Sequence, residues 1–196
     1  MATQNHASFY TIYTRLTSTY NYPVLASASP YPHEKDLSHH IANLQLHPAL
    51  ECILHILNGD LTSAHFLLRH MQSPPAWEGM YIHGILHRIE GDYRNAEAWY
   101  GDVCDSECFK QCWPEGVEAA KGFIQDVERL RKEKVGNESE LARVSKKEFD
   151  ALVEWCKAQF GTDRWEDGTK AWVEPSEKIR EMAAKQTMGG EGWRQF

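Results

Sequence analysis

The apolar residues between positions 45 and 104 recur with a helical period, and one pattern occurs twice among them. The strings ILHILNGDLTSAHF (53–66) and ILHRIEGDYRNAEA (85–98) align at an offset of 32 residues. In each string an apolar run is followed by a Gly-Asp pair and then by a second run of helical period. Glycine adopts the left-handed conformation that ends many helices and aspartate caps the next one, so the pattern predicts two consecutive helical hairpins. The shared residues are Ile53/Ile85, Leu54/Leu86, His55/His87, Gly59/Gly91, Asp60/Asp92 and Ala64/Ala96.

The second copy, taken with the residues before it, resembles the tetratricopeptide (TPR) repeat. The signature of that family is W-x2-L-G-x2-Y, followed by A-x3-F and then P. The chain has M-x2-H-G-x2-H at 80–87, G-D-Y at 91–93 and A-x3-Y at 96–100, so small and aromatic positions fall in register. The first copy has Cys52 at the small position. The resemblance implies an all-α fold of TPR-like antiparallel helical hairpins that binds a peptide or a partner protein.

The flanking segments are expected to cap the hairpins with N- and C-terminal helices, because two repeat units leave their end faces uncovered. Residues 1–44 form the N-terminal segment, with a short helix predicted over 8–20 and then a loop rich in Pro, Ser and Tyr. Residues 45–134 form the TPR-like repeat core, which ends in a predicted helix over 115–134.

Residues 135–196 are expected to hold a linker and the C-terminal capping helices. The polar string VGNESELARV (135–144) is the predicted linker. The segment 146–161 places apolar residues on one helical face and stops at a glycine, which predicts a helix. An acidic loop that bears tryptophan follows, and residues 175–188 are expected to form the final helix because they begin with Pro-Ser and acidic residues.

A longer set of residues is similar to a group of uncharacterised fungal and bacterial proteins. That resemblance implies a family without implying an activity. The residues that carry it are Ala64, His65, Glu78, His83, His87, Arg88, Glu90, Asp92, Asn95, Ala96, Trp99 and Tyr100, followed far downstream by GEGWRQF.

The composition of the chain argues against some classes of function, namely binding to nucleic acids and association with membranes. The chain has 196 residues, 42% hydrophobic and 11% aromatic, which is typical of a globular protein. The 28 acidic residues outnumber the 21 Lys and Arg, and no basic stripe is present, so binding to DNA or RNA is not expected. No signal-peptide pattern and no run of about 18 apolar residues is found, so no membrane association is expected. Five cysteines are then expected to be reduced thiols in the cytoplasm or nucleus.

Three residues of the second copy are candidates for chemistry. His83, His87 and Glu90 lie at i, i+4 and i+7, so a helix places their side chains on one face. Two imidazoles one turn apart can bind a divalent metal ion, and a carboxylate one turn on can add a ligand. Among residues outside this helix, His65 is the best candidate for a further ligand, because it lies in the second helix of the preceding hairpin. These four residues predict a metal site or an acid–base site, and no other cofactor is expected.

The same histidines are also explained as core residues. The TPR register places positions 83 and 87 where one helix packs on another. His55 occupies the position of His87 in the first copy, which favours a scaffold role for His87. Glu51 occupies the position of His83, so the repeat does not account for His83.

Two classes of function follow from these patterns. The favoured one is a non-enzymatic helical-repeat module that binds a peptide or partner protein on its concave surface, with Arg88, Tyr93, Asn95 and Trp99 as candidate contacts. The polar run over 88–97 is equally explained as a solvated helical face with ion pairs. The competing class is a small metal-dependent or histidine-based enzyme, so the sequence leaves open whether the chain is an enzyme.

Three cysteines follow a C-x3-C-x3-C spacing, which places their thiols along one face if the helix is continuous. The spacing differs from the C-x2-C of common zinc sites, and thiols one turn apart make poor disulfides because their Cβ vectors diverge. We interpret Cys104, Cys108 and Cys112 as packing thiols, with a thiol redox switch as a third class of function.

Overall fold

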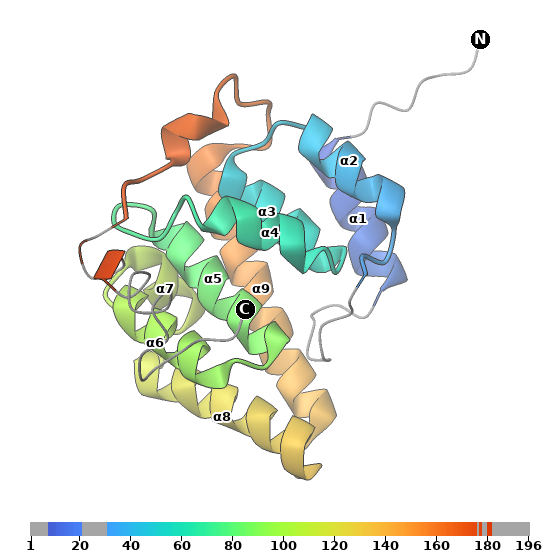
Figure 1. Cartoon of the computed structure of the whole chain (residues 1–196). Coiled ribbons are helices and arrows are strands. Elements are labelled where there is room, and N and C mark those ends of the chain that lie inside the picture. Colours follow the sequence, from blue (N-terminus) through green and yellow to red (C-terminus); the bar gives the residue numbers. More distant parts are fainter. Residues whose placement is uncertain (1–7, 21–30, 176, 178–179, 182–196) are drawn as a thin grey trace.

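In residues 8–20, 31–175, 177, 180 and 181, which the computed structural model describes, every regular element is a helix (Figure 1). The predicted all-α class is therefore confirmed. No helix in these residues is long and apolar enough to cross a lipid bilayer. The elements are α1 (Phe9–Thr19), α2 (Lys35–Asn43), α3 (Pro48–Leu57), α4 (Leu61–Leu68), α5 (Trp77–Glu90), α6 (Tyr93–Val103), α7 (Glu107–Cys112), α8 (Val117–Glu133), α9 (Glu138–Phe160) and the short 3-10 helix η1 (Gly168–Ala171).

The repeated pattern forms two helical hairpins, α3 with α4 and α5 with α6, and α5 packs against both helices of the first hairpin. Gly59 and Gly91 follow α3 and α5 with φ angles of 69° and 92°, a left-handed conformation that glycine adopts without strain. Asp60 and Asp92 then cap α4 and α6 by accepting backbone N–H groups three residues on, at 3.1 and 3.2 Å. Both predicted Gly-Asp turns are present, whereas the relation to the TPR family stays a prediction.

Helix α5 lies at the centre of the molecule, in contact with α3, α4, α6 and α7. Eleven of its fourteen residues are buried, so the polar side chains on it are held inside the protein. Helices α1 and α2 lie against α3, and α9 packs against α3, α7 and α8. The predicted final helix over 175–188 falls mostly outside the described residues.

An aromatic contact around His47 joins the end of α9 to the start of α3. The His47 ring stacks on Phe160 with centroids 3.5 Å apart, and Trp165 meets it edge-on at 4.4 Å. Nδ1 of His47 accepts the backbone N–H of Ala49 at 3.2 Å, so this side chain caps α3. Burial lowers the pKa of His47 from 6.5 to about 4. The neutral ring that burial favours is the form that can accept the capping hydrogen bond.

Side chains of α5 and α9 meet in a buried ion pair. Nη2 of Arg88 donates to Oε2 of Glu148 at 2.7 Å, and only 2% and 1% of the two side chains are exposed. The Tyr81 and Tyr100 hydroxyls and the Trp113 indole N–H donate to Oε1 of the same carboxylate at 2.8, 2.5 and 2.9 Å. Although burial disfavours the charged guanidinium, the attraction of Glu148 leaves the pKa of Arg88 raised. Arg88 therefore stays charged in the core.

The predicted linker over 135–144 is wrong, because α9 begins at Glu138 and runs unbroken to Phe160. Asn137 caps this helix by accepting the backbone N–H of Glu140 at 3.2 Å. The first turns look solvated in the sequence, but Leu141 is buried and fixes them to the core. The predicted stop at Gly161 is confirmed, since α9 ends one residue before it.

The N-terminal segment contains a helix that the sequence pattern did not predict. Residues 21–30 of the predicted loop lie outside the described residues, and α2 begins at Lys35. Leu37 and Ile41 lie one turn apart on α2, are buried and face α3. Two apolar residues in a short polar string are a weak helical signal, and their burial against α3 decides the conformation.

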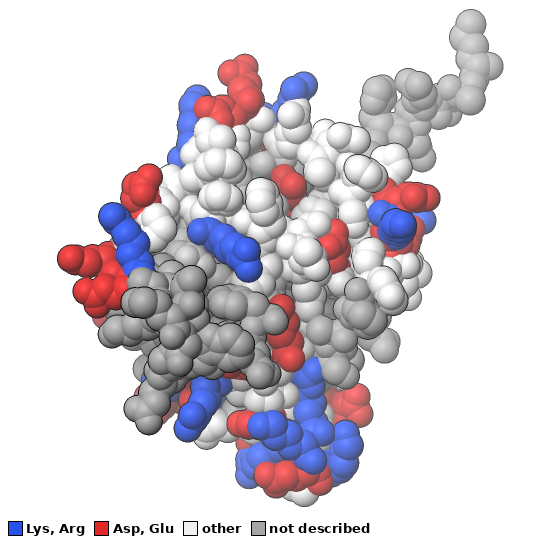
Figure 2. Space-filling view, in the orientation of Figure 1, with Lys and Arg blue, Asp and Glu red and all other residues white. Residues whose placement is uncertain are grey.

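The face of the molecule in Figure 2 carries charges of both signs. Mixed clusters lie along the edges of this face, among them one at the lower end where α8 meets the start of α9, whereas its central part is mainly uncharged. Opposite charges paired along a helix cancel at a distance, so this face lacks the basic stripe that nucleic acids require. The pairs at the lower end are Arg129–Asp126, Lys132–Glu128 and Arg143–Glu140.

Candidate metal centre

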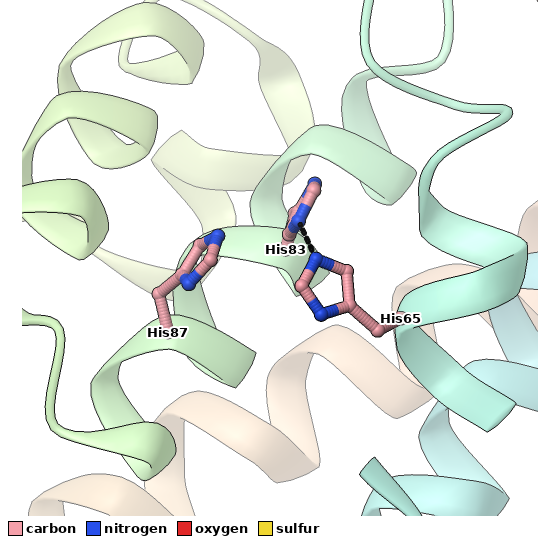
Figure 3. A group of neighbouring side chains, drawn as sticks. All are labelled: His65, His83 and His87. Carbon is pink, nitrogen blue, oxygen red and sulfur yellow. Dashed lines mark hydrogen bonds between the residues drawn. The ribbon is translucent and has the colours of Figure 1, made fainter. Parts of the chain in front are cut away.

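Three imidazoles from two hairpins converge at the boundary between α4 and α5 (Figure 3). His83 and His87 lie one turn apart on α5, and His65 reaches toward them from α4. One nitrogen atom from each ring lies within 4.8 Å of those of the other two. His83 and His87 are buried, whereas 15% of the His65 side chain is exposed. The cluster is therefore interior but reaches the surface on its α4 side.

The rings of His65 and His83 share a hydrogen bond. Their Nε2 atoms are 3.1 Å apart, so one ring donates a proton and the other accepts it. Two protonated rings cannot make this contact, because both nitrogens of an imidazolium are donors. Burial lowers the pKa of His65, although the nearby Glu90 carboxylate opposes that shift. His65 therefore tends toward neutral imidazole, the form that binds a metal ion.

His87 has a polar side chain next to each of its ring nitrogens. Its Nδ1 lies 3.2 Å from Oε2 of Glu90, three residues on in α5. Its Nε2 lies 3.1 Å from the side-chain amide nitrogen of Asn95 on α6. The other Glu90 oxygen, Oε1, lies 3.9 Å from Nδ1 of His65. The Glu90 carboxylate thus faces two of the three imidazoles, and 33% of its side chain is exposed.

The faces of the His83 ring are packed between aromatic neighbours. His87 stacks on it at 4.7 Å between centroids and Trp99 at 4.7 Å. Gly84 permits this approach of α6 to α5, because a Cβ there would lie 2.8 Å from the Tyr100 ring and 3.0 Å from Cβ of Trp99. Such stacking is what a core histidine makes, and it fixes the ring plane. The edge that carries Nε2 meets His65 instead, and stacking alone does not account for that contact.

The first hairpin contains the repeat-equivalent of His87 but no histidine cluster, so it serves as a comparison. His55, which corresponds to His87, places Nδ1 3.2 Å from Oδ2 of Asp60 and Nε2 3.7 Å from Oε1 of Glu51. Glu51 stands where His83 stands in the second hairpin, so no second imidazole faces His55 there. A buried histidine beside a carboxylate is therefore a property of the repeat. The three imidazoles converge only because His83 on α5 faces His65 on α4, and the described residues contain no such contact at His55.

The spacing of the nitrogens fits a metal ion after a small adjustment. Zinc–nitrogen bonds are about 2.0–2.1 Å long, so tetrahedral ligands lie about 3.4 Å apart and no two exceed about 4.2 Å. The His65–His83 separation of 3.1 Å is close to the tetrahedral value. The nitrogen–nitrogen separations in the cluster reach up to 4.8 Å, so at least one ring must move for all three imidazoles to bind one ion.

The donor set is one that divalent transition metals accept. Neutral imidazole suits Zn, Cu, Fe and Ni, whereas Mg and Ca prefer oxygen ligands. No family model, no curated protein and no solved structure matches the chain. Any function must therefore be inferred from the side chains themselves.

The four residues predicted to contact a partner lie in the interior of the protein. Arg88, Tyr93, Asn95 and Trp99 are all buried. Asn95 and Trp99 lie against the histidine cluster, whereas Arg88 turns to α9 and Tyr93 lies beneath the end of α8. Their role in binding a partner stays a prediction. Glu78, of the looser family resemblance, accepts the indole N–H of Trp155 at 2.7 Å.

The chain is not one continuous helix over the three cysteines, so the condition for placing their thiols along one face is not met. Helix α6 ends at Val103, and Ser106 caps α7 by accepting the backbone N–H of Phe109 at 3.2 Å. Cys104 is therefore separated from the other two thiols of the motif. The hydrogen bond with Cys112 and burial raise the pKa of the Cys108 thiol. A thiol that stays protonated and buried reacts slowly, so the chemistry favours packing over a redox switch.

Proposed function

We propose that the chain is a metal-dependent enzyme with one divalent transition-metal ion bound between α4 and α5. The convergence of His65, His83 and His87 carries this proposal, because one nitrogen of each lies within 4.8 Å of the others. The three side chains come from two hairpins, so their meeting requires the tertiary fold. Neighbouring Glu90 supplies the carboxylate that commonly orients a metal-binding histidine.

The proposed chemistry is hydrolytic. Three neutral imidazoles leave the charge of the ion uncompensated and one tetrahedral position open for water. An ion in such a site lowers the pKa of bound water to about 7, which makes hydroxide available as a nucleophile at neutral pH. The exposed parts of the His65 and Glu90 side chains mark the side from which water and a substrate would reach the ion.

Metal analysis of the chain purified without a polyhistidine tag tests the proposal. We expect about one zinc-type ion per chain, bound by three protein ligands and water. The variant His83→Gln keeps a side chain that can hydrogen-bond to His65 but removes one ligand. Loss of a residue that only hydrogen-bonds to a metal ligand lowers metal affinity by about 10–100-fold. Loss of a ligand itself should therefore weaken Zn²⁺ binding by at least that factor.

The first hairpin offers a matched control. His55→Gln changes a buried histidine with carboxylate neighbours at the repeat position of His87, outside the cluster. It should leave the Zn²⁺ affinity unchanged. A wild-type chain that takes up no stoichiometric metal after exposure to Zn²⁺, Co²⁺ and Fe²⁺ would contradict the proposal, and so would an equal loss in both variants.

A second candidate function is the helical-repeat module that binds a protein or peptide. It is favoured by exposed aromatic side chains on α4 and after η1, where Phe66 is 61% and Trp172 42% exposed. His70 stacks on Trp172 at 4.1 Å and contacts Phe66 edge-on at 5.4 Å. The double variant Phe66→Ser/Trp172→Ser should lose partners that the wild type retains. Identical sets of retained proteins would count against this role.

A further inference from the structure

His87 cannot bind a metal ion through Nε2 without losing its hydrogen bond to Asn95, whose amide nitrogen lies 3.1 Å away. Its other ring nitrogen, Nδ1, lies 3.2 Å from Oε2 of Glu90 but outside hydrogen-bond geometry. A neutral imidazole has one N–H group and one lone pair, and a metal ion needs the lone pair. The question is which nitrogen carries the lone pair, and which partner the ion would have to displace.

Glu90 decides the position of the proton. A carboxylate oxygen 3.2 Å from Nδ1 repels a lone pair on that nitrogen and attracts an N–H group, so the contact favours the hydrogen on Nδ1. The lone pair of His87 is then on Nε2. This tautomer agrees with the contact on the other side, where the Asn95 amide presents its nitrogen, a donor, to Nε2. The contacts on both sides therefore assign the same tautomer.

The same carboxylate favours the same tautomer in His65. Oε1 of Glu90 lies 3.9 Å from Nδ1 of that ring, and its Nε2 faces His83 at 3.1 Å. Carboxylates that hold the Nδ1–H of metal-binding histidines are common outer partners, and they leave Nε2 for the ion. Glu90 is thus placed to orient the ligands.

We infer that Asn95 competes with the metal ion for the Nε2 lone pair of His87 and so lowers the affinity of the site. This inference rests on the metal site proposed above. The hydrogen bond between Nε2 of His65 and Nε2 of His83 must open before both rings bind an ion, and at His87 the ion must in addition displace the Asn95 amide from Nε2. Asn95 therefore makes the third ligand conditional, and the site takes up only ions that bind imidazole strongly enough to break that hydrogen bond.

The surroundings of Asn95 make this side chain suitable for substitution. It is buried, and its Oδ1 has no hydrogen-bond partner among the described residues. The cap of α6 uses the backbone N–H of Asn95 and the side chain of Asp92, so it does not depend on the amide. Its replacement leaves the buried Nε2 of His87 without a partner, which lowers the stability of the fold, so each variant is checked for folding before it is titrated.

Titration of untagged wild type and Asn95→Leu with Co²⁺, followed by its visible absorption, tests the inference. One hydrogen bond of ordinary strength corresponds to about fivefold in an equilibrium constant, so Asn95→Leu should bind Co²⁺ about fivefold more tightly. Asn95→Ser, whose short side chain does not reach Nε2, should show the same gain. Ser63→Ala is the matched control, because Ser63 holds the repeat position of Asn95 in the first hairpin, and it should leave the affinity unchanged.

The outcomes separate this inference from the proposed function. If wild type binds Co²⁺ and both Asn95 variants bind equally or more weakly, the inference is overturned and the metal site stands. If no variant binds Co²⁺, the metal site fails and the inference fails with it. Nitrogen NMR of the metal-free protein gives an independent reading, since His87 is expected as the Nδ1–H tautomer. An Nε2–H tautomer would overturn the competition whatever the affinities are.

Discussion

Replacement of Glu148 by alanine is expected to lower the free energy of unfolding by about 3–5 kcal/mol, because it leaves a buried charge without its partner. Arg88 is 2% exposed, and its Nε and Nη1 have no hydrogen-bond partner among the described residues. Without the carboxylate the guanidinium remains charged in an apolar interior. Tyr81, Tyr100 and Trp113 lose their common acceptor at the same time.

Urea denaturation of wild type and Glu148→Ala measures the difference in their free energies of unfolding. Glu140→Ala serves as the control on the same helix, because Glu140 is exposed and pairs with Arg143, and such pairs contribute about 1 kcal/mol or less. The double variant Arg88→Met/Glu148→Leu removes both charges and should regain much of the loss. A loss below about 1 kcal/mol for Glu148→Ala would mean that Arg88 finds water or another partner, contrary to its described contacts.

Acidification from pH 7.5 to pH 5 is expected to lower the stability by about 2 kcal/mol through His47 alone. Burial holds the pKa of His47 at about 4 in the folded chain, against 6.5 when unfolded. Below pH 6.5 the unfolded chain therefore binds a proton that the folded chain does not. Stability is full above pH 6.5, falls as the pH drops through 6.5 toward 4, and levels off below that.

The variant His47→Asn separates this contribution from those of other groups. Asparagine is a good N-cap and does not titrate, so it keeps an acceptor for the Ala49 N–H while removing the proton linkage. Denaturation at several pH values should give a lower stability at pH 7.5, because stacking on Phe160 is lost, and a flatter profile down to pH 5. Carboxyl groups titrate mainly below this window. An unchanged slope in the variant would show that His47 is not the group responsible.

Local signals in the sequence were sufficient for the two hairpins and for most of the histidine site. The Gly-Asp pairs specify helix ends through glycine conformation and aspartate capping, and both depend on neighbouring residues alone. The spacing of His83, His87 and Glu90 fixes a common helix face in the same way. His65 was identified because the repeat places it in the helix next to α5, where it meets His83.

The partners of the buried ion pair could not be found from the sequence. Glu148 lies 60 residues after Arg88, and it sits in the charged string KKEFD, which is typical of a solvated helix face. The position of α9 relative to α5 comes from packing across the whole core, which no short-range pattern records. Tyr93 was expected at the surface for the same reason, since the repeat pattern does not include α8, which packs on α6.

The histidine cluster lies on the seam between the two repeat units. His83 and His87 belong to one hairpin, and His65 alone belongs to the other. Relative sliding of the hairpins therefore changes the His65–His83 separation and leaves the geometry of the other two histidines intact. An ion held by all three would act as a cross-link, fastening one unit to the next much as further units do in a longer array. Two hairpins without further repeat units beside them would thereby gain mechanical rigidity from the proposed metal centre.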